Sequence, residues 1–433
     1  MAVRMIMGVV ADDITGSNDI GIMFAKAGLL AHVYAYPGPD PLDRLLSDSA
    51  PDITILDTNS RLDAPQVAYD KVFAATRALM AAGCTRFHNK TCSVFRGNVG
   101  AEFDAMLDAL GQEFAVVVLG FPKNGRQTID GVHYVHGKKL EESEFRNDPV
   151  HPMRRSDLVG ILQAQTRRTV GLIDHRVVGQ GPDALRAALD AARARWNYVI
   201  LDVVDQTALA TIARAVRDCP VLCGSSAIAE ELPGAWGVQP VKRAESVPPR
   251  VAGLGVLAVA GSLMPQTAAQ IDHLRARGAP SFELDPLALF GPESRAETLD
   301  AMSDRLSRAL QSGQDALLYT ARAPETVAAV RAEGARRGQS GTESARRVSE
   351  ALAEIVARVV ARTRLNRLLV AGGETSNAVS QRLGVYGLRI WQEIEPGLPL
   401  CLSLSDPPLL LVLKSGSFGS PAFFEQALDH LKA

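Results

Sequence analysis

The chain has 433 residues, of which 47% are hydrophobic and 22% are charged, and its formal net charge is −2. These values are typical of an ordinary soluble protein. A nearly balanced charge provides no general electrostatic surface for nucleic acid or for an anionic membrane, so we expect the chain to bind neither. Because one hydrophobic core stops growing beyond about 250–300 residues, the length predicts two domains of roughly 200 residues each.

The cysteines and the first residues of the chain indicate in which cellular compartment the protein is expected. Five cysteines, at positions 84, 92, 219, 223 and 401, are an odd number in a long chain, which favours free thiols over a disulfide framework. Cys219 and Cys223 have no neighbouring Cys or His pair at zinc-binding spacing, so we expect no structural metal. The first apolar run is short and soon meets acids, and no apolar stretch reaches the roughly 20 residues of a membrane span. We therefore expect a cytoplasmic protein.

The first half of the sequence alternates short apolar runs with helical patterns, which is typical of βαβ units around a parallel sheet. Apolar residues at i, i+3, i+4 and i+7 from Ile20 predict a helix, and Asp63 is expected to cap the next one. Residues 127–140 predict a hairpin with turns at Asp130-Gly131 and His136-Gly137. Strands are expected at Met5–Val10, Ile53–Leu56, Arg86–His88, Ala115–Leu119, Val170–Ile173, Tyr198–Val203 and Val221–Cys223.

A domain boundary is expected where prolines and mixed charge replace the apolar period. We assign an N-terminal domain to residues 1–240, a linker to 241–253 and a C-terminal domain to 254–433. The second domain has predicted strands in the sequences GVLAVAGS, DALLYT, RLLVAGGET and LLLVLKSGSFG, and residues 334–342 are expected to form an exposed loop. The predicted fold is α/β, with two three-layer Rossmann-like domains, mostly parallel sheets and a cleft between the domains.

Charged residues follow four of the predicted strands in the first half. Strands of an open α/β sheet present functional residues at their carboxyl ends. The candidates are Asp12, Asp13, Arg61, Lys90, Arg96 and either Lys123 or Arg126. Two acids beside several cations suit a polyhydroxylated anion, because cations pair with a carboxylate or phosphate and an acid accepts a hydroxyl proton. A strand-end aspartate is also commonly a helix cap, so Asp12 or Asp13 alone would not indicate a site.

Three glycine-rich segments follow strands in the second half, at residues 260–264, 371–378 and 414–420. Glycines after a strand allow the backbone to approach phosphate groups, and hydroxyls at the following helix start add donors. None of the three matches the P-loop or the dinucleotide fingerprint, and glycine in such turns is also a common steric requirement. Together, three of them in one domain predict a nucleotide or phosphate site.

The order and spacing of these motifs resemble the four-carbon acid sugar kinase family along nearly the whole chain. The resemblance rests on ADDITGSND (11–19), the Arg61 loop, KTCSVFRGNVGAE (90–102), GRQTIDGVHYVHGKKLEESEFRNDP (125–149), GGETS (372–376), EIEPGLP (393–399) and KSGSFG (414–419). Where family members commonly read KKIDSTLRGN, this chain has NKTCSVFRGN, so Thr91 or Cys92 replaces an acid. That departure concerns the identity of the substrate more than the type of reaction.

The resemblance implies a substrate domain followed by a nucleotide domain, with ATP phosphorylating the terminal 4-hydroxyl of a four-carbon sugar acid. D-Threonate is the first substrate expected, with D-erythronate and 3-oxo-tetronates as alternatives. Carried over by motif, the acid sugar is held by Asp12, Asp13, Arg61, Lys90, Thr91, Cys92 and Ser93, and ATP by Ser262, Gly372, Gly373, Glu374, Thr375, Gly416 and Gly419. We expect Asp12, Lys90 and Arg96 to carry the chemistry, and Mg²⁺ to sit on phosphate oxygens rather than on protein ligands.

Two other classes of protein stay open. An NAD(P)-dependent oxidoreductase would suit paired α/β domains, but no G-x-G-x-x-G follows the first strand. A non-enzymatic sugar-acid sensor would use a similar cleft, but no DNA-binding motif accompanies it. The sequence leaves open the stereochemistry of the substrate, the formation of homo-oligomers, and the choice between Asp12 and Asp13 as the catalytic base.

Overall fold

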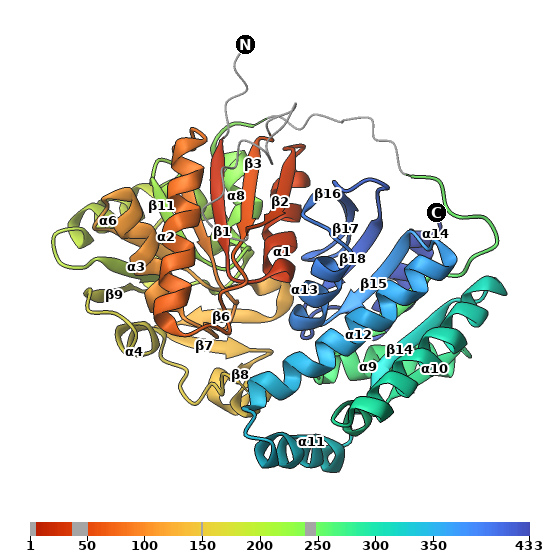
Figure 1. The fold of residues 1–433 in the computed structure, drawn as a ribbon. Coiled ribbons are helices and arrows are strands. Elements are labelled where there is room, and N and C mark those ends of the chain that lie inside the picture. Colours follow the sequence, from red (N-terminus) through yellow and green to blue (C-terminus); the bar gives the residue numbers. More distant parts are fainter. Residues whose placement is uncertain (1–5, 37–50, 149, 239–247) are drawn as a thin grey trace. The chain divides into compact units, whose positions relative to one another are not determined.

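A computed structural model describes residues 6–36, 51–148, 150–238 and 248–433 of the chain (Figure 1). The chain divides into two compact units, residues 1–243 and 244–433, called here the N-terminal and C-terminal units. Each is an α/β unit with a mostly parallel sheet, as predicted. The first seven residues of the predicted linker at 241–253 and the predicted strand start at Met5 lie outside the described residues. No described helix is both long enough and apolar enough to span a membrane.

The sheet of the N-terminal unit consists of parallel strands in the order β2-β3-β1-β4-β11-β5-β10-β9. They are β1 (Met7–Ala11), β2 (Ala31–Ala35), β3 (Ile53–Asp57), β4 (Phe87–Lys90), β5 (Ala115–Val118), β9 (Val170–Ile173), β10 (Tyr198–Leu201) and β11 (Val221–Gly224). The predicted strands are therefore confirmed with small shifts at their ends. Strand β2 was not predicted, because His32 and Tyr34 interrupt its apolar run; the two side chains hydrogen bond to each other at 3.1 Å.

Helices cover both faces of this sheet. They are α1 (Ile14–Ala25), α2 (Pro65–Ala81), α3 (Val99–Leu110), α4 (Leu158–Gln163), α5 (His175–Val178), α6 (Pro182–Ala192), α7 (Gln206–Val216) and α8 (Ile228–Ala235). The chain crosses the sheet in one direction through α1, α6 and α7 and in the other through α2 and α3. Right-handed crossovers therefore place the two groups on opposite faces. The contacts agree, since α2 packs on α3 (Figure 1), while α8 packs on both α1 and α7.

The predicted hairpin is confirmed. It is formed by β6 (Arg126–Ile129), β7 (Val132–Val135) and the short β8 (Lys138–Lys139), which pair antiparallel in a separate sheet. Both residues of each turn have positive φ, at 50° and 76° for Asp130-Gly131 and 49° and 78° for His136-Gly137. Such values define the type I′ turns that match the twist of a hairpin. Short 3₁₀ helices flank it at Pro122–Asn124, Leu140–Glu142 and Glu144–Asn147.

One predicted helix cap is wrong. Helix α2 begins after Ala64, with Pro65 in its first turn and no side chain capping it. Asp63 instead accepts a hydrogen bond from Lys71 Nζ at 2.6 Å. Proline at the first helical position already lacks the N–H that a cap would satisfy, which explains how the helix starts without one.

Strand β1 occupies the position in the sheet that determines where a ligand can bind. The chain leaves β1 toward β2 and β3 on one side and later returns to β4 on its other side. Ala11, at the end of β1, is level with Asp57 of β3 and with Lys90 of β4, and Lys90 is level with Gly224 of β11. The segments that follow these strands therefore emerge together at a topological switch point, where open α/β sheets bind ligands.

The sheet of the C-terminal unit has the order β13-β14-β12-β15-β18-β17-β16. Its strands are β12 (Leu257–Ala260), β13 (Ser281–Leu284), β14 (Ala316–Thr320), β15 (Arg367–Ala371), β16 (Gly387–Glu395), β17 (Leu398–Ser403) and β18 (Leu410–Lys414). The first five in this order are parallel, and β17 and β16 pair antiparallel at the end. The turns after β12, β15 and β18 therefore leave the same edge of the sheet.

The helices of this unit are α9 (Pro265–Ala276), α10 (Pro292–Gln311), α11 (Pro324–Arg336), α12 (Gly341–Thr363), α13 (Gly373–Arg382) and α14 (Phe423–Lys432), with a 3₁₀ turn at Pro286–Leu289. The exposed loop predicted for 334–342 is wrong in extent, because α11 and α12 reach into it from both sides. Ser340 and Glu343 form a capping box that starts α12. The basic polar residues of this stretch are thus partly helical, and only 337–340 connect the two helices.

Candidate substrate and nucleotide sites

Arg61 is the centre of a buried charge cluster at the carboxyl edge of the N-terminal sheet. Its Nε and Nη2 each donate to one oxygen of Asp12 at 2.7 Å, and its Nη1 donates to Asp13 Oδ2. Burial alone would lower the pKa of Arg61, but the two carboxylates outweigh it and raise that pKa well above its usual value. Bidentate pairing fixes both the position and the orientation of the guanidinium. Three of its five N–H donors are used in these contacts.

The two acids at the end of β1 have different roles. Asp13 is the N-cap of α1: its Oδ1 accepts from the Gly16 backbone N–H at 2.6 Å, and its Oδ2 accepts from Thr15 Oγ1 at 3.1 Å. Burial would raise the pKa of Asp13, but Arg61 and Lys90 outweigh it and lower the pKa. Asp12 caps no helix, and both of its oxygens face Arg61.

The segment that carries Arg61 is held on both sides. Thr58 Oγ1 donates to the carbonyl of Ala11 at 2.9 Å, and Ser60 Oγ donates to Glu102 Oε1 at 2.7 Å. Gly97 approaches closely: it has a φ of +100°, and a Cβ there would lie 3.0 Å from Arg61 Cγ. The structure thus explains the glycine of the sequence Arg96-Gly97-Asn98, because a side chain would be strained and would push Arg61 away.

Arg96 and Cys92 form a second pair beside Arg61. Arg96 Nε donates to Cys92 Sγ at 3.3 Å, its Nη1 donates to Asp148 Oδ2 at 2.7 Å, and its guanidinium lies 5.1 Å from the ring centroid of Phe145. Burial would raise the pKa of the Cys92 thiol, but Arg96 and Arg61 outweigh it and lower the pKa. The lowered pKa favours the reactive thiolate form of Cys92, and the activating groups are arginines rather than a histidine.

Lys90 is almost fully buried at the end of β4. Its Nζ donates to the Thr91 carbonyl at 3.0 Å and lies 3.7 Å from Asp19 Oδ2. A Cβ on Gly16 would lie 2.9 Å from this ammonium group, so the glycine leaves room for it. Thr91 and Ser93 are also buried at this edge. The structure therefore brings the predicted residues 90–93 next to the Arg61 cluster.

The two further cations considered in the sequence behave differently. Arg126 is buried at 1% exposure, and its guanidinium lies 6.0 Å from the centroid of the Phe145 ring that Arg96 also faces. Lys123 instead pairs with Glu230 at 2.8 Å and is 40% exposed. The net positive charge at this edge is also smaller than the sequence suggested, because Asp12, Asp13 and Asp148 pair with Arg61 and Arg96.

Three buried acids at this edge were not singled out in the sequence. Burial raises the pKa of Asp19 to about 6, and burial together with Asp13 raises that of Asp57 to about 8. Burial and Asp12 raise the pKa of Glu102 well above its usual value. Asp19 could have been found, because it lies six residues after Asp13, inside the ADDITGSND motif. Asp57 ends strand β3, which is also a signal of a functional position.

In the C-terminal unit, the three glycine-rich turns come together. Gly261 donates its N–H to the carbonyl of Ala371 at 3.1 Å, which joins the exits of β12 and β15. A Cβ on Gly261 would lie 2.1 Å from Thr375 Oγ1, and one on Gly416 would lie 2.1 Å from Ser262 Oγ. Side chains at these glycines would collide with the hydroxyls. The turns therefore need glycine in order to pack together.

These turns also present donors to one region. Helix α13 begins at Gly373, after Gly372 with a φ of +115°, and no side chain caps its first N–H groups. Glu374 and Thr375 lie in its first turn, and Ser262 Oγ accepts from the Met264 N–H at 3.2 Å. A helix start that has no side-chain cap and has neighbouring hydroxyls is a favourable site for phosphate. Gly419, the last predicted residue, packs against the Gln270 amide on α9.

Lys414, the last residue of β18, contacts two of these turns. Its backbone carbonyl accepts from the Gly372 N–H at 2.9 Å, and its Nζ lies 3.2 Å from Thr267 Oγ1 and 3.5 Å from the Gly416 carbonyl. The side chain is fully buried, and burial lowers its pKa to about 7. Lys414 was part of the KSGSFG motif but was not predicted to have a role of its own.

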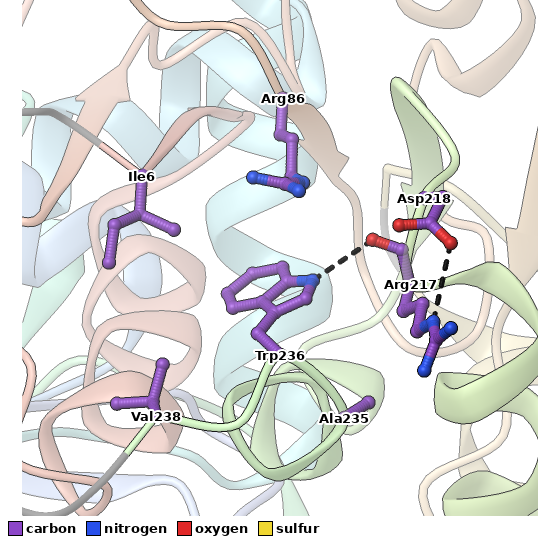
Figure 2. A pocket seen from close by; sticks show the side chains of 7 residues that line it. All are labelled: Ile6, Arg86, Arg217, Asp218, Ala235, Trp236 and Val238. Carbon is purple, nitrogen blue, oxygen red and sulfur yellow. Dashed lines mark hydrogen bonds and ion pairs between the residues drawn. The ribbon is translucent and has the colours of Figure 1, made fainter.

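A separate pocket lies at the opposite edge of the N-terminal sheet (Figure 2). It has a volume of about 430 Å³ and is lined by Ile6, Arg86, Arg217, Asp218, Ala235, Trp236 and Val238. The Arg86 guanidinium lies 5.5 Å from the Trp236 ring centroid, and Trp236 Nε1 donates to the Arg217 carbonyl at 3.1 Å. Ile6 and Arg86 precede β1 and β4. The pocket is therefore at the amino ends of the strands and contains none of the predicted site residues.

One group of side chains has the composition of a metal site. Ligand atoms of Asp130, His175 and Asp202 lie within 4.8 Å of one another. The Asp202 carboxylate, however, accepts from the backbone N–H groups of Asp130, Gly131 and His175 at 2.7, 2.9 and 3.0 Å. These bonds occupy Asp202 in fixing the hairpin turn, which is a structural role.

Comparison with protein families gives a match in each unit. Residues 7–232 match the family described as a sugar-binding N-terminal domain, and residues 257–424 match that described as a nucleotide-binding C-terminal domain. The first match contains the Arg61 cluster, and the second contains the three glycine-rich turns.

Full-length relatives agree with these matches. The chain is 35% identical to a 3-oxo-tetronate kinase of Cupriavidus necator, over 100% of this chain and 98% of that protein, and 34% identical to one of Pseudomonas fluorescens, over 99% and 97%. Among solved structures, it is similar to a Salmonella typhimurium protein described as a candidate tRNA synthase, with a TM-score of 0.80 and 28% identity over 98% and 99% of the two chains. A Haemophilus influenzae protein follows, with a TM-score of 0.70 and 27% identity over 98% and 100%.

Proposed function

Because the chain belongs to the four-carbon acid sugar kinase family and is a phosphotransferase with an alcohol group as acceptor, we propose that it phosphorylates the 4-hydroxyl of 3-oxo-tetronate with ATP. The observation that best supports this proposal is the full-length similarity to relatives named for this activity. D-Threonate, which the sequence favoured, and D-erythronate are the alternative acceptors. Both differ from 3-oxo-tetronate at C3, where they carry a hydroxyl that donates and accepts hydrogen bonds, whereas the ketone oxygen of 3-oxo-tetronate only accepts them.

The Arg61 cluster is proposed to hold the sugar acid. Arg61 and Arg96 keep N–H donors beyond those that bind Asp12, Asp13, Cys92 and Asp148, and such donors suit the substrate carboxylate. The acids that already pair with them hold the two guanidinium groups in place before the substrate arrives, which reduces the ordering needed on binding. Lys90 is proposed to face the transferring phosphoryl group.

The glycine-rich turns of the C-terminal unit are proposed to bind ATP. The start of α13 supplies N–H groups, and Ser262 and Thr375 supply hydroxyls beside it. The oxygens of Ser262, Glu374 and Thr375 would suit a hard cation, although Mg²⁺ is expected to keep most of its contacts to phosphate and water. When bound, Mg²⁺ neutralises charge on the transferring phosphoryl group.

A coupled assay of ADP release tests this proposal. Purified protein with Mg-ATP is offered 3-oxo-tetronate, D-threonate or D-erythronate, and the products are identified by mass spectrometry. We expect the highest kcat/KM with 3-oxo-tetronate and a product that carries one phosphate at the terminal oxygen. Absence of ADP release with all three acids would contradict the proposal. Binding of a sugar acid without any phosphorylated product would instead indicate a sensor.

A further inference from the structure

We propose that Asp19 is the catalytic base, which accepts the proton of the sugar-acid hydroxyl as the phosphoryl group is transferred. The proposal rests on the kinase function argued above and names a residue within the same site. Sequence reasoning assigned this role to Asp12 or Asp13.

Asp19 lies in the second turn of α1 and is 4% exposed. Its Oδ2 accepts from Ser226 Oγ at 2.6 Å and lies 3.7 Å from Lys90 Nζ. Its Oδ1 is buried and has no hydrogen-bond partner among the described residues. A buried carboxylate oxygen without a partner disfavours the folded state, so its presence beside a proposed phosphoryl-binding lysine calls for a functional reason.

The other acids at this edge are less suitable. Both Asp12 oxygens accept from Arg61, and the Asp13 carboxylate accepts from Arg61, Thr15 and the Gly16 N–H. Asp57, with a pKa of about 8, is mostly protonated near neutral pH, and burial raises the pKa of Glu102, whose Oε1 already accepts from Ser60 Oγ at 2.7 Å. A protonated acid cannot accept a proton, and a carboxylate whose oxygens already accept hydrogen bonds from the protein is less available to a substrate hydroxyl. Asp19 alone among these acids combines an unpartnered oxygen with ionisation at neutral pH.

The charges that face Asp19 tune it for this task. Burial raises its pKa to about 6, Lys90 and Ser226 oppose that rise, Asp13 adds to it, and Arg126 opposes it. A general base is most effective when its pKa lies near the working pH. Asp19 is therefore ionised at pH 7 and still basic enough to take a proton.

The hydroxyl oxygen forms a bond to the γ-phosphorus of ATP, and the bond between that phosphorus and the β,γ-bridging oxygen breaks. The electron pair of the broken bond leaves with ADP. The hydroxyl proton passes to Asp19 Oδ1 and is later released to water. Because the transition state of phosphoryl transfer is loose, the proton moves late, and Asp19 first orients the hydroxyl.

Asp19→Asn tests the assignment, with Asp190→Asn on the exposed face of α6 as the matched control. We expect Asp19→Asn to lower kcat by about 10²- to 10⁴-fold, to leave the calorimetric affinity for the sugar acid nearly unchanged, and to keep the fold as judged by circular dichroism. In the wild type, kcat should fall as the pH drops through about 6, and this decrease should be absent from the residual activity of the variant.

Wild-type activity separates failure of this inference from failure of the proposed function. If the wild type is active and Asp19→Asn keeps kcat within about threefold, Asp19 is not the base. Ser226→Ala is an independent test of the Asp19 assignment, because the variant loses the hydrogen bond that stabilises the ionised Asp19 carboxylate. The acidic decrease in kcat should then move to higher pH. An unchanged profile in Ser226→Ala would assign that decrease to another group and overturn the proposal.

Discussion

Cys92 is a residue whose chemistry depends on its neighbours rather than on its own type. Burial raises the pKa of Cys84 to about 12, whereas Arg96 and Arg61 lower the pKa of the Cys92 thiol despite its burial. We expect a small methylthiolating reagent to modify Cys92 first near neutral pH and to inactivate the enzyme, because the thiolate is the reactive form. Peptide mass spectrometry locates the label, and a sugar acid should slow both labelling and inactivation.

Cys92→Ser is the control for this prediction. The variant should resist inactivation while its other four cysteines remain available. Inactivation of Cys92→Ser at the wild-type rate would show that a different thiol is responsible and would contradict the assigned reactivity.

Asp57 gives a prediction about stability. Its carboxyl has a pKa of about 8 in the folded protein, whereas in the unfolded chain it ionises above its ordinary pKa of 3.8. Between these two values the folded state binds one proton more than the unfolded state, so stability falls as the pH rises. Asp57→Asn removes this titration and keeps the shape of the neutral acid. We expect the Tm of the variant minus that of the wild type, measured by differential scanning calorimetry, to increase from about pH 4 to pH 8. A constant Tm difference would contradict the raised pKa.

The turn after β18 gives a prediction about an element of structure. Gly416 has an ordinary φ, but a Cβ on it would lie 2.1 Å from Ser262 Oγ. Gly416→Ala should therefore displace the Ser262 turn and raise KM for ATP by about tenfold or more, with a smaller effect on KM for the sugar acid. Gly341→Ala is the matched control, because nothing lies within 4 Å of the added Cβ. Equal effects on both Michaelis constants would argue against a nucleotide-binding role for this turn.

The elements that were predicted correctly have strong local signals. Strands such as Ala115–Val118 are apolar on successive residues because helices cover both faces of the sheet, and this pattern is visible in the sequence. Strand β16 lacks this signal, since it carries charged and half-buried residues toward its end, whereas the apolar run of β17 is interrupted by Pro399. The connection 337–340 was predicted too long, because its charged residues extend over exposed helix faces. Packing, and not local composition, decides these cases.

For the molecule as a whole, the sequence predicted which residues lie together better than it predicted the contacts among them. Arg61, Lys90 and Arg96 were predicted to lie together because polar residues at the ends of parallel strands meet at one edge. Their pairing with Asp12, Asp13, Asp148 and Asp19 depends on side-chain packing between segments that are distant in the sequence. The raised pKa values depend on the same packing. Neither feature could be read from the order of residues.

The last prediction concerns the protein as a kinase with two substrates. The proposed sugar-acid residues lie in the N-terminal unit and the proposed ATP residues in the C-terminal unit, so either ligand can bind to its own residues without the other. Water is smaller than the sugar acid and would compete as acceptor unless transfer depends on the second substrate. We expect ATP to bind alone by calorimetry, while ADP release without a sugar acid is at least about 100-fold slower than with it. A sugar acid that lacks the 4-hydroxyl should occupy the site without restoring ADP release, because it offers no oxygen for transfer. ATP hydrolysis that is equally fast with and without the acid would contradict this dependence and would point to an ATPase.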